Sequence, residues 1–120
     1  IIDNKKEWKN YFKYILIDAP CSGLGTLARN PDARWRISSL MIDEMIILQR
    51  KLLESISPLL SPGGRIVYST CTINPDENSR LIDKFIGSNQ ELILKEESQL
   101  WPNINKSGDG FYVAIMEHTG

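Results

Sequence analysis

Two short apolar runs on either side of one long amphipathic stretch constrain the fold of this chain most strongly. Residues 14–17 form a continuous apolar run, typical of a strand that is buried on both faces. Residues 65–72 are rich in β-branched and aromatic side chains and predict a second strand. Between them, apolar residues recur at helical spacing from Met41 to Ile56. This order predicts two parallel strands joined by a right-handed helical crossover.

Turn and capping signals divide the rest of the chain. The segment 61–64, Ser-Pro-Gly-Gly, predicts that the long helix ends and that the chain reverses before the second strand. Asn74 as N-cap, Pro75 at the first helical position and Glu77 resemble a capping box, so we expect a second helix to begin there. Gly87 is its expected end.

Two further strands follow, at residues 91–97 and 111–118. No helical pattern separates them, so they are expected to be antiparallel neighbours. The whole order predicts an α/β fold with a mostly parallel sheet and an antiparallel final strand. The sequence contains no internal repeat or low-complexity tract, and residues 1–120 are expected to form a single domain.

The composition argues against several classes of protein. Lys and Arg number 14 against 15 acidic residues, which gives a net charge of −1 and no overall basic field for nucleic acid or anionic membranes. Any nucleic-acid contact must therefore come from local features. The sequence has neither an apolar run of membrane-spanning length nor a signal segment, so a cytoplasmic location without membrane partners is expected. Two cysteines are too few for a disulfide framework and fit a reducing compartment.

Both cysteines follow predicted strand ends. Asp18 and Cys21 come after the first strand, and Thr70 and Cys71 end the second. Ligands of open parallel sheets bind outside the carboxyl ends of the strands, so these residues are expected to meet in one cleft. A thiol that is placed there beside a carboxylate can act as a nucleophile.

Each of these residues also has a structural explanation. A lone Cys71 is more often a small buried side chain than a nucleophile, and the expected compartment disfavours a disulfide between the two cysteines. Asp18 is as well explained by capping a turn. As a magnesium ligand of a nucleotide hydrolase, it would need a phosphate-binding loop that the sequence lacks. Pro20 stiffens the approach of the chain to Cys21.

A loop after the first strand combines positive charge with an aromatic ring. Arg29, Arg34, Trp35 and Arg36 can contact phosphates and stack on a base. Trp35 can equally well pack under the loop while the arginines are solvated. His118 has no potential ligand partners in the sequence, and we expect no metal site.

Three segments resemble, in order, motifs of the Nop/Sun family of RNA 5-methylcytosine methyltransferases. The combination of a Pro-Cys and a Thr-Cys motif at this spacing is highly specific, and the similarity covers nearly the whole chain. The segments are DAPCSGLGTLARNPDARWR at 18–36, LLSPGGRIVYSTCTINPDENS at 59–79 and GDGFYVAIMEH at 108–118.

The resemblance implies a Rossmann-like fold, S-adenosylmethionine as cofactor and a cytosine of ribosomal or transfer RNA as substrate. It implies that Cys71 is the nucleophile, that Cys21 assists release and that Asp18 holds the base. Asp18, Ala19 and Pro20 are expected to line the methionine end of the cofactor pocket. The residues expected to contact RNA are Arg29, Arg34, Trp35, Arg36 and Thr70.

The family's glycine-rich cofactor loop and its ribose-binding acid lie upstream of the motifs in this chain. We therefore expect the chain to be the C-terminal part of a catalytic domain, inactive alone, whose N-terminal half belongs to the full-length protein. Ser79 also replaces a second acid of the family pattern, which we interpret as a local change. The alternative is a catalytically silent RNA-binding or assembly module of the same fold.

Overall fold

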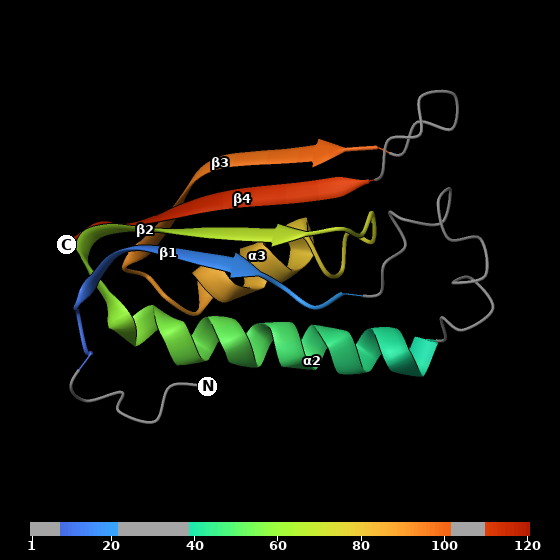
Figure 1. Cartoon of the computed structure of the whole chain (residues 1–120), viewed down its shortest axis with the longest axis horizontal. Helices are drawn as coiled ribbons and strands as arrows, with labels where there is room; N and C mark the ends of the chain where they lie inside the picture. The colour runs from blue at the N-terminus through green and yellow to red at the C-terminus, as the bar shows by residue number, and fades with distance from the viewer. Residues whose placement is uncertain (1–7, 22–38, 102–109) are drawn as a thin grey trace.

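The computed structural model describes residues 8–21, 39–101 and 110–120. Strands and helices alternate along the chain, except that two strands come last (Figure 1). This is the order that the sequence predicted. The elements are β1 (Phe12–Asp18), α2 (Ser39–Ile56), the 3-10 helix η2 (Ser57–Leu59), β2 (Leu60–Thr70), α3 (Ser79–Gly87), β3 (Leu92–Leu100) and β4 (Phe111–His118).

The four described strands form one sheet in the order β1-β2-β4-β3. β1 is parallel to β2, and β4 is antiparallel to both β2 and β3. β3 therefore runs in the same direction as β1 and β2. The predicted α/β fold, with a mostly parallel sheet and an antiparallel final strand, is confirmed. The insertion of β4 between β2 and β3 was not predicted.

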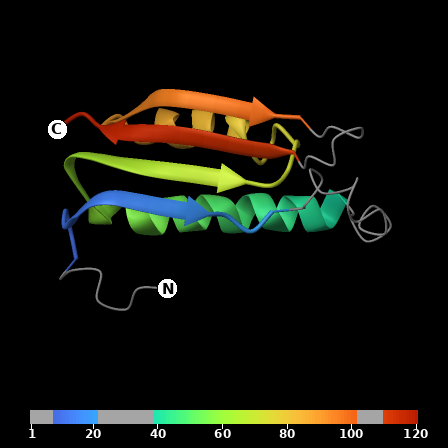
Figure 2. The ribbon, with the colours of Figure 1, turned by 45° about the horizontal axis from the view of Figure 1, so that its top comes forward.

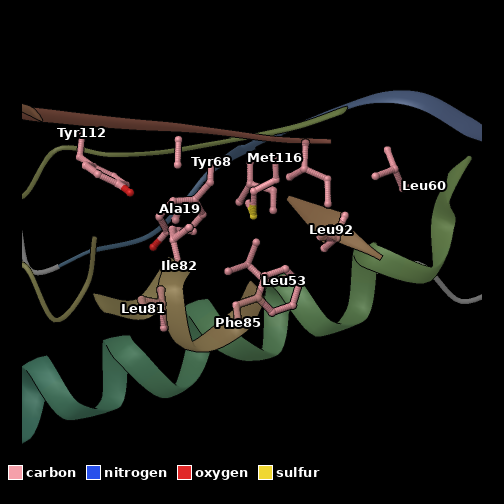
Figure 3. Packing of buried hydrophobic residues seen from close by; sticks show 13 residues of the cluster. Ala19, Leu53, Leu60, Tyr68, Leu81, Ile82, Phe85, Leu92, Tyr112 and Met116 are labelled. Carbon is pink, nitrogen blue, oxygen red and sulfur yellow. The ribbon is translucent and has the colours of Figure 1, made fainter. Parts of the chain in front are cut away.

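The core lies between the sheet and the two helices, which cover the same face (Figures 2 and 3). Leu53 of α2 and Phe85 of α3 are fully buried and lie across from Tyr68 and Met116 of the sheet. Alternate residues of β2 and β4 supply the sheet side of this core, as the two-residue period of a strand requires. This core packs both helices against the sheet, beneath the strand ends that carry the cysteines.

The first strand is more exposed than its sequence predicted. Ile17 faces the core and is buried, and Ile15 packs against it. Tyr14 and Leu16 point to the opposite face, where they are 70% and 73% exposed. The prediction of a strand buried on both faces is wrong for the described residues, because both described helices lie on one face of the sheet.

The Ser-Pro-Gly-Gly segment lies within β2 and not before it. Pairing with β1 shifts from Phe12 opposite Leu60 to Tyr14 opposite Arg65, so residues 61–64 face a single residue of β1. Gly63 in this bulge has φ of 78°, a conformation that favours glycine. The predicted chain reversal at residues 61–64 is therefore a bulge inside β2, and β2 begins before these residues, at Leu60.

We expect Gly64→Ala to lower the free energy of unfolding by about 1–3 kcal/mol. An added Cβ would lie 2.7 Å from Leu60 Cδ1, 2.8 Å from Ser61 O and 2.9 Å from Lys13 O. Two of these are backbone atoms held by strand pairing, so they cannot move aside easily. Denaturant unfolding measures the effect. Gly87→Ala is the control, because no heavy atom lies within 4 Å of its added Cβ, and equal stability of the two variants would contradict the prediction.

The second helix begins later than its sequence predicted. α3 starts at Ser79, and a turn precedes it, in which Pro75 O accepts from the following backbone amides. The capping box is wrong in detail: Glu77 accepts from Asn74 Nδ2, and the Asn74 backbone N–H donates to Thr72 Oγ1. The Glu77 side chain accepts hydrogen bonds from Gln49, Thr72 and Asn74 instead. The predicted end of this helix is confirmed.

Candidate active site

The two cysteines lie side by side just after the carboxyl ends of β1 and β2. The arrowheads of these strands mark that edge of the sheet (Figure 1). Cys21 Sγ and Cys71 Sγ are 3.1 Å apart, both residues are half-buried, and no disulfide joins them. The strands remain paired to their ends, since Ala19 N donates to Ser69 O at 2.9 Å. The prediction that the two cysteines converge is confirmed. Their chemical roles remain predictions.

Asp18 ends β1 and is exposed. Its Oδ1 accepts from Ser69 Oγ at 3.5 Å, across the paired strands. Of the two residues that follow it, Ala19 is buried in the core, whereas Pro20 is exposed. A carboxylate therefore reaches the surface at the strand end where the sequence predicted it. Binding of a cofactor by these three residues remains a prediction.

Side-chain hydrogen bonds fix the segment that carries Cys71. Thr70 Oγ1 donates to Asn78 Oδ1 at 2.6 Å, and Asn78 Nδ2 donates to Thr72 O at 2.8 Å and Gln99 Oε1 at 2.9 Å. Thr70 and Asn78 are buried. These bonds fasten residues 71–78 to β2 and β3. The Thr70 hydroxyl thus holds the loop, and contact of this residue with a substrate remains a prediction.

Glu77 is a fully buried carboxylate at the centre of the same loop. It accepts hydrogen bonds from Gln49 Nε2 at 3.1 Å, Thr72 Oγ1 at 3.3 Å and Asn74 Nδ2 at 3.1 Å. The Tyr68 hydroxyl donates to the main-chain oxygen of Glu77, and burial raises the pKa of this tyrosine above its usual range. A buried carboxylate is costly unless it is hydrogen-bonded, and these donors meet that need.

A cleft of about 250 Å³ opens beside this loop, between α3 and the ends of β3 and β4. The Tyr112 hydroxyl donates to Glu97 Oε2 in its wall. Burial raises the pKa of Tyr112 above its usual range, and the hydrogen bond to Glu97 raises it further. Trp101 lines the cleft and is 66% exposed. The other lining residues are Ile73, Pro75, Ser79 and Gln99.

The sequence analysis missed several polar residues of the site, among them Gln49, Asn78 and Gln99. Gln49 had a detectable signal, because it occupies the apolar stripe of α2 between Met45 and Leu52. A polar residue at a core position needs a hydrogen-bond partner, which marks it for attention. Asn78 and Gln99 gave no such signal.

The segment with the expected RNA contacts lies outside the described residues. Arg29, Arg34, Trp35 and Arg36 all belong to it, so their contacts with RNA remain predictions. Within the described ranges, no group of three or more His, Cys, Asp or Glu residues could hold a metal ion. No helix there is long and apolar enough to cross a membrane.

The site thus combines two adjacent thiols with one exposed carboxylate. A thiolate adds readily to an electron-poor carbon, and a second thiol within hydrogen-bond distance can donate a proton to a departing sulfur. The arrangement suits a reaction in which a sulfur–carbon bond is made and later broken.

The chain is similar to known methyltransferases. Residues 2–117 match the family described as 16S rRNA methyltransferase RsmB/F. The chain is 51% identical over 76 residues to the probable ribosomal RNA small subunit methyltransferase B of Synechocystis, covering 63% of this chain and 17% of the relative. It is 40% identical over 105 residues to ribosomal RNA small subunit methyltransferase B of Proteus mirabilis, covering 88% and 25%. The chain therefore spans a quarter or less of the length of these relatives.

A solved structure shares the fold. The crystal structure of NSun6 from Pyrococcus horikoshii with SFG superposes on 88% of this chain and 30% of its own. The TM-score is 0.75 and the sequence identity is 25%. The four-stranded sheet and its helices therefore correspond to part of a larger methyltransferase fold.

Proposed function

Because the chain belongs to the 16S rRNA methyltransferase RsmB/F family, we propose that it is the C-terminal part of the catalytic domain of an RNA (cytosine-5) methyltransferase. The substrate is a cytosine of ribosomal RNA or transfer RNA, and the methyl donor is S-adenosylmethionine. The observation that carries the proposal is the 3.1 Å contact between the sulfurs of Cys21 and Cys71 at the carboxyl edge of the sheet.

The chemistry of cytosine explains why a thiol is needed. Carbon 5 of the ring is too electron-poor to take a methyl group from a sulfonium, so a nucleophile must first add to carbon 6. In this proposal the Cys71 thiolate forms the bond to carbon 6, which makes carbon 5 enamine-like. Asp18, exposed at the end of β1, delivers a proton to the ring nitrogen as the addition proceeds, which neutralises the negative charge that the addition creates. Its carboxylate then accepts hydrogen bonds from that N–H and from the amino group.

The second cysteine serves the end of the reaction. The proton on carbon 5 passes to water, the electron pair that it leaves re-forms the double bond between carbons 5 and 6, and the Cys71 thiolate is expelled. Cys21 Sγ lies within hydrogen-bond distance of that sulfur and assists its departure. The target base must be unstacked to reach such a site, as in an RNA loop or a flipped nucleotide.

The residues at the end of β1 fit one end of the cofactor. When bound, S-adenosylmethionine supplies the methyl group. In this proposal Asp18, Ala19 and Pro20 line its methionine end. The remainder of the pocket belongs, in this proposal, to the N-terminal half of the catalytic domain in the full-length, cytoplasmic protein. The proposed RNA contacts are Arg29, Arg34, Trp35 and Arg36, through phosphates and base stacking.

A covalent trap tests the proposal. RNA that carries 5-fluorocytosine is incubated with S-adenosylmethionine and either this chain or the protein extended upstream, then run on a denaturing gel. Fluorine cannot leave carbon 5 as a proton does, so the enzyme stays attached to the RNA. We expect an adduct with the extended protein and none with the chain alone.

Two outcomes would contradict the proposal. An extended protein that binds RNA and cofactor yet forms no adduct would favour the catalytically silent RNA-binding module. An adduct with the 120-residue chain alone would show that the upstream half is not needed for catalysis.

A further inference from the structure

Gln49 lies on α2, beneath the strand ends, and is fully buried. Its Nε2 donates two hydrogen bonds, to Pro20 O at 2.8 Å and to Glu77 Oε1 at 3.1 Å. The two acceptors belong to different loops, one after β1 and one after β2. A single amide group therefore spans the two loops that carry the cysteines.

Both of these hydrogen bonds lead directly to a cysteine. Pro20 precedes Cys21, and the Pro20 carbonyl shares the planar peptide unit that continues into Cys21. Glu77 also accepts from Thr72 Oγ1 at 3.3 Å, and Thr72 follows Cys71. Hydrogen bonds thus connect Pro20, through Gln49 and Glu77, to Thr72. Pro20 and Thr72 are the sequence neighbours of the two cysteines, whose sulfurs are 3.1 Å apart.

The second polar atom of the same amide shows that this position is not chosen for packing alone. Gln49 Oε1 is buried and has no hydrogen-bond partner among the described residues. Exchanging the oxygen and the nitrogen would aim the oxygen at two acceptors, Pro20 O and Glu77 Oε1, so the hydrogen bonds fix the orientation of the amide. An apolar side chain here would fill the core without an unpaired oxygen. An apolar side chain could not donate the two hydrogen bonds to Pro20 O and Glu77 Oε1.

We propose that Gln49 is a positioning residue, whose amide sets the distance between the loops of Cys21 and Cys71 and so holds both sulfurs at one reaction centre. Its catalytic consequence rests on the proposed methyltransferase function. The geometric consequence does not, because the two sulfurs can be tested for proximity without any substrate.

The test uses the full-length protein with Gln49→Met, which keeps a similar volume and removes both donors. The first readout is the rate at which diamide joins Cys21 to Cys71. In that reaction the two sulfurs form a bond, and the oxidant takes up the two thiol hydrogens. We expect the rate to fall by about tenfold or more, since a loosened pair loses effective concentration. Leu53→Val, a buried change one turn along the same helix, should change the rate by less than about twofold.

The second readout is adduct formation with 5-fluorocytosine RNA at saturating RNA and S-adenosylmethionine. We expect Gln49→Met to lower the maximal rate by about tenfold or more and to leave the KM for RNA unchanged, because the residue touches neither RNA nor cofactor in this proposal. A purely structural role would instead lower the melting temperature in both core variants and leave both rates unchanged. Thr72→Val interrupts the same path at its other end while α2 stays intact, and it should reproduce both losses.

The outcomes separate this inference from the proposed function. Wild-type rates of cross-linking in both Gln49→Met and Thr72→Val would overturn the role of Gln49. If the wild-type protein forms no adduct, the proposed function fails, while slower cross-linking in Gln49→Met would still support the positioning role. If Gln49→Met does not fold, the cross-linking rate of Thr72→Val decides the question.

Discussion

Replacing Cys71 by alanine in the full-length protein is expected to abolish the covalent adduct with 5-fluorocytosine RNA and to lower methylation by roughly 10³- to 10⁶-fold. The reason is that carbon 5 of cytosine gains nucleophilic character only after a thiolate has added to carbon 6. In the proposed site that thiolate comes from Cys71, at the end of β2. The adjacent Cys21 follows a different strand and is not expected to replace it.

The measurement combines a denaturing gel with the transfer of a radioactive methyl group to RNA. The control is binding: Cys71→Ala should keep the wild-type affinity for RNA and for S-adenosylmethionine, because the half-buried side chain changes little in volume. The loop around it is held by hydrogen bonds from Thr70 Oγ1 to Asn78 Oδ1, from Thr72 Oγ1 to Glu77 Oε2 and from Asn78 Nδ2 to Thr72 O, which do not use the Cys71 side chain. Methylation at the wild-type rate in this variant would exclude Cys71 as the nucleophile.

Replacing Cys21 by alanine should have a different effect. We expect the variant to add to ordinary cytosine but to release it slowly, so that a covalent RNA complex accumulates without any fluorinated base. Cys21 Sγ is 3.1 Å from Cys71 Sγ, which places it to assist the departing sulfur. Loss of a group that transfers a proton in this way lowers turnover by about 10²- to 10⁴-fold.

A denaturing gel with unmodified RNA checks this result, and methyl transfer under multiple-turnover conditions measures the loss. The double variant Cys21→Ala, Cys71→Ala is the matched control, because it lacks the nucleophile and should give no complex. Wild-type turnover in Cys21→Ala would remove Cys21 from the mechanism. A complex in the double variant would show that the bond to RNA is made by another residue.

The sequence predicted the elements of the fold well, because their signals are local. The helical spacing of apolar residues in 41–56 and the β-branched composition of 65–72 depend only on the periods of a helix and a strand. The boundaries were less accurate. β2 begins at Leu60 because a bulge absorbs the glycines, and α3 begins at Ser79 because Glu77 is drawn into the buried network. Both shifts come from partners far away in the sequence.

The exposure of β1 is a second feature that local patterns could not give. The apolar run 14–17 predicts a strand, and the strand exists, but Tyr14 and Leu16 face the side that no described helix covers. An apolar run predicts a strand, but it does not show which face of that strand another element covers. The number of layers on each face is a property of the whole arrangement.

The candidate site divides in the same way. By itself the sequence determined that two cysteines and an aspartate lie at the ends of two parallel strands. Strand ends are encoded locally, the strand–helix–strand order predicts parallel strands, and the carboxyl ends of parallel strands share one edge. Only the tertiary structure decided that Gln49 of α2 joins Pro20 to Glu77, and that two sulfurs separated by many residues approach to 3.1 Å. Those contacts depend on how a helix packs beneath the sheet, and packing is fixed by the shapes of all the side chains in the core at once.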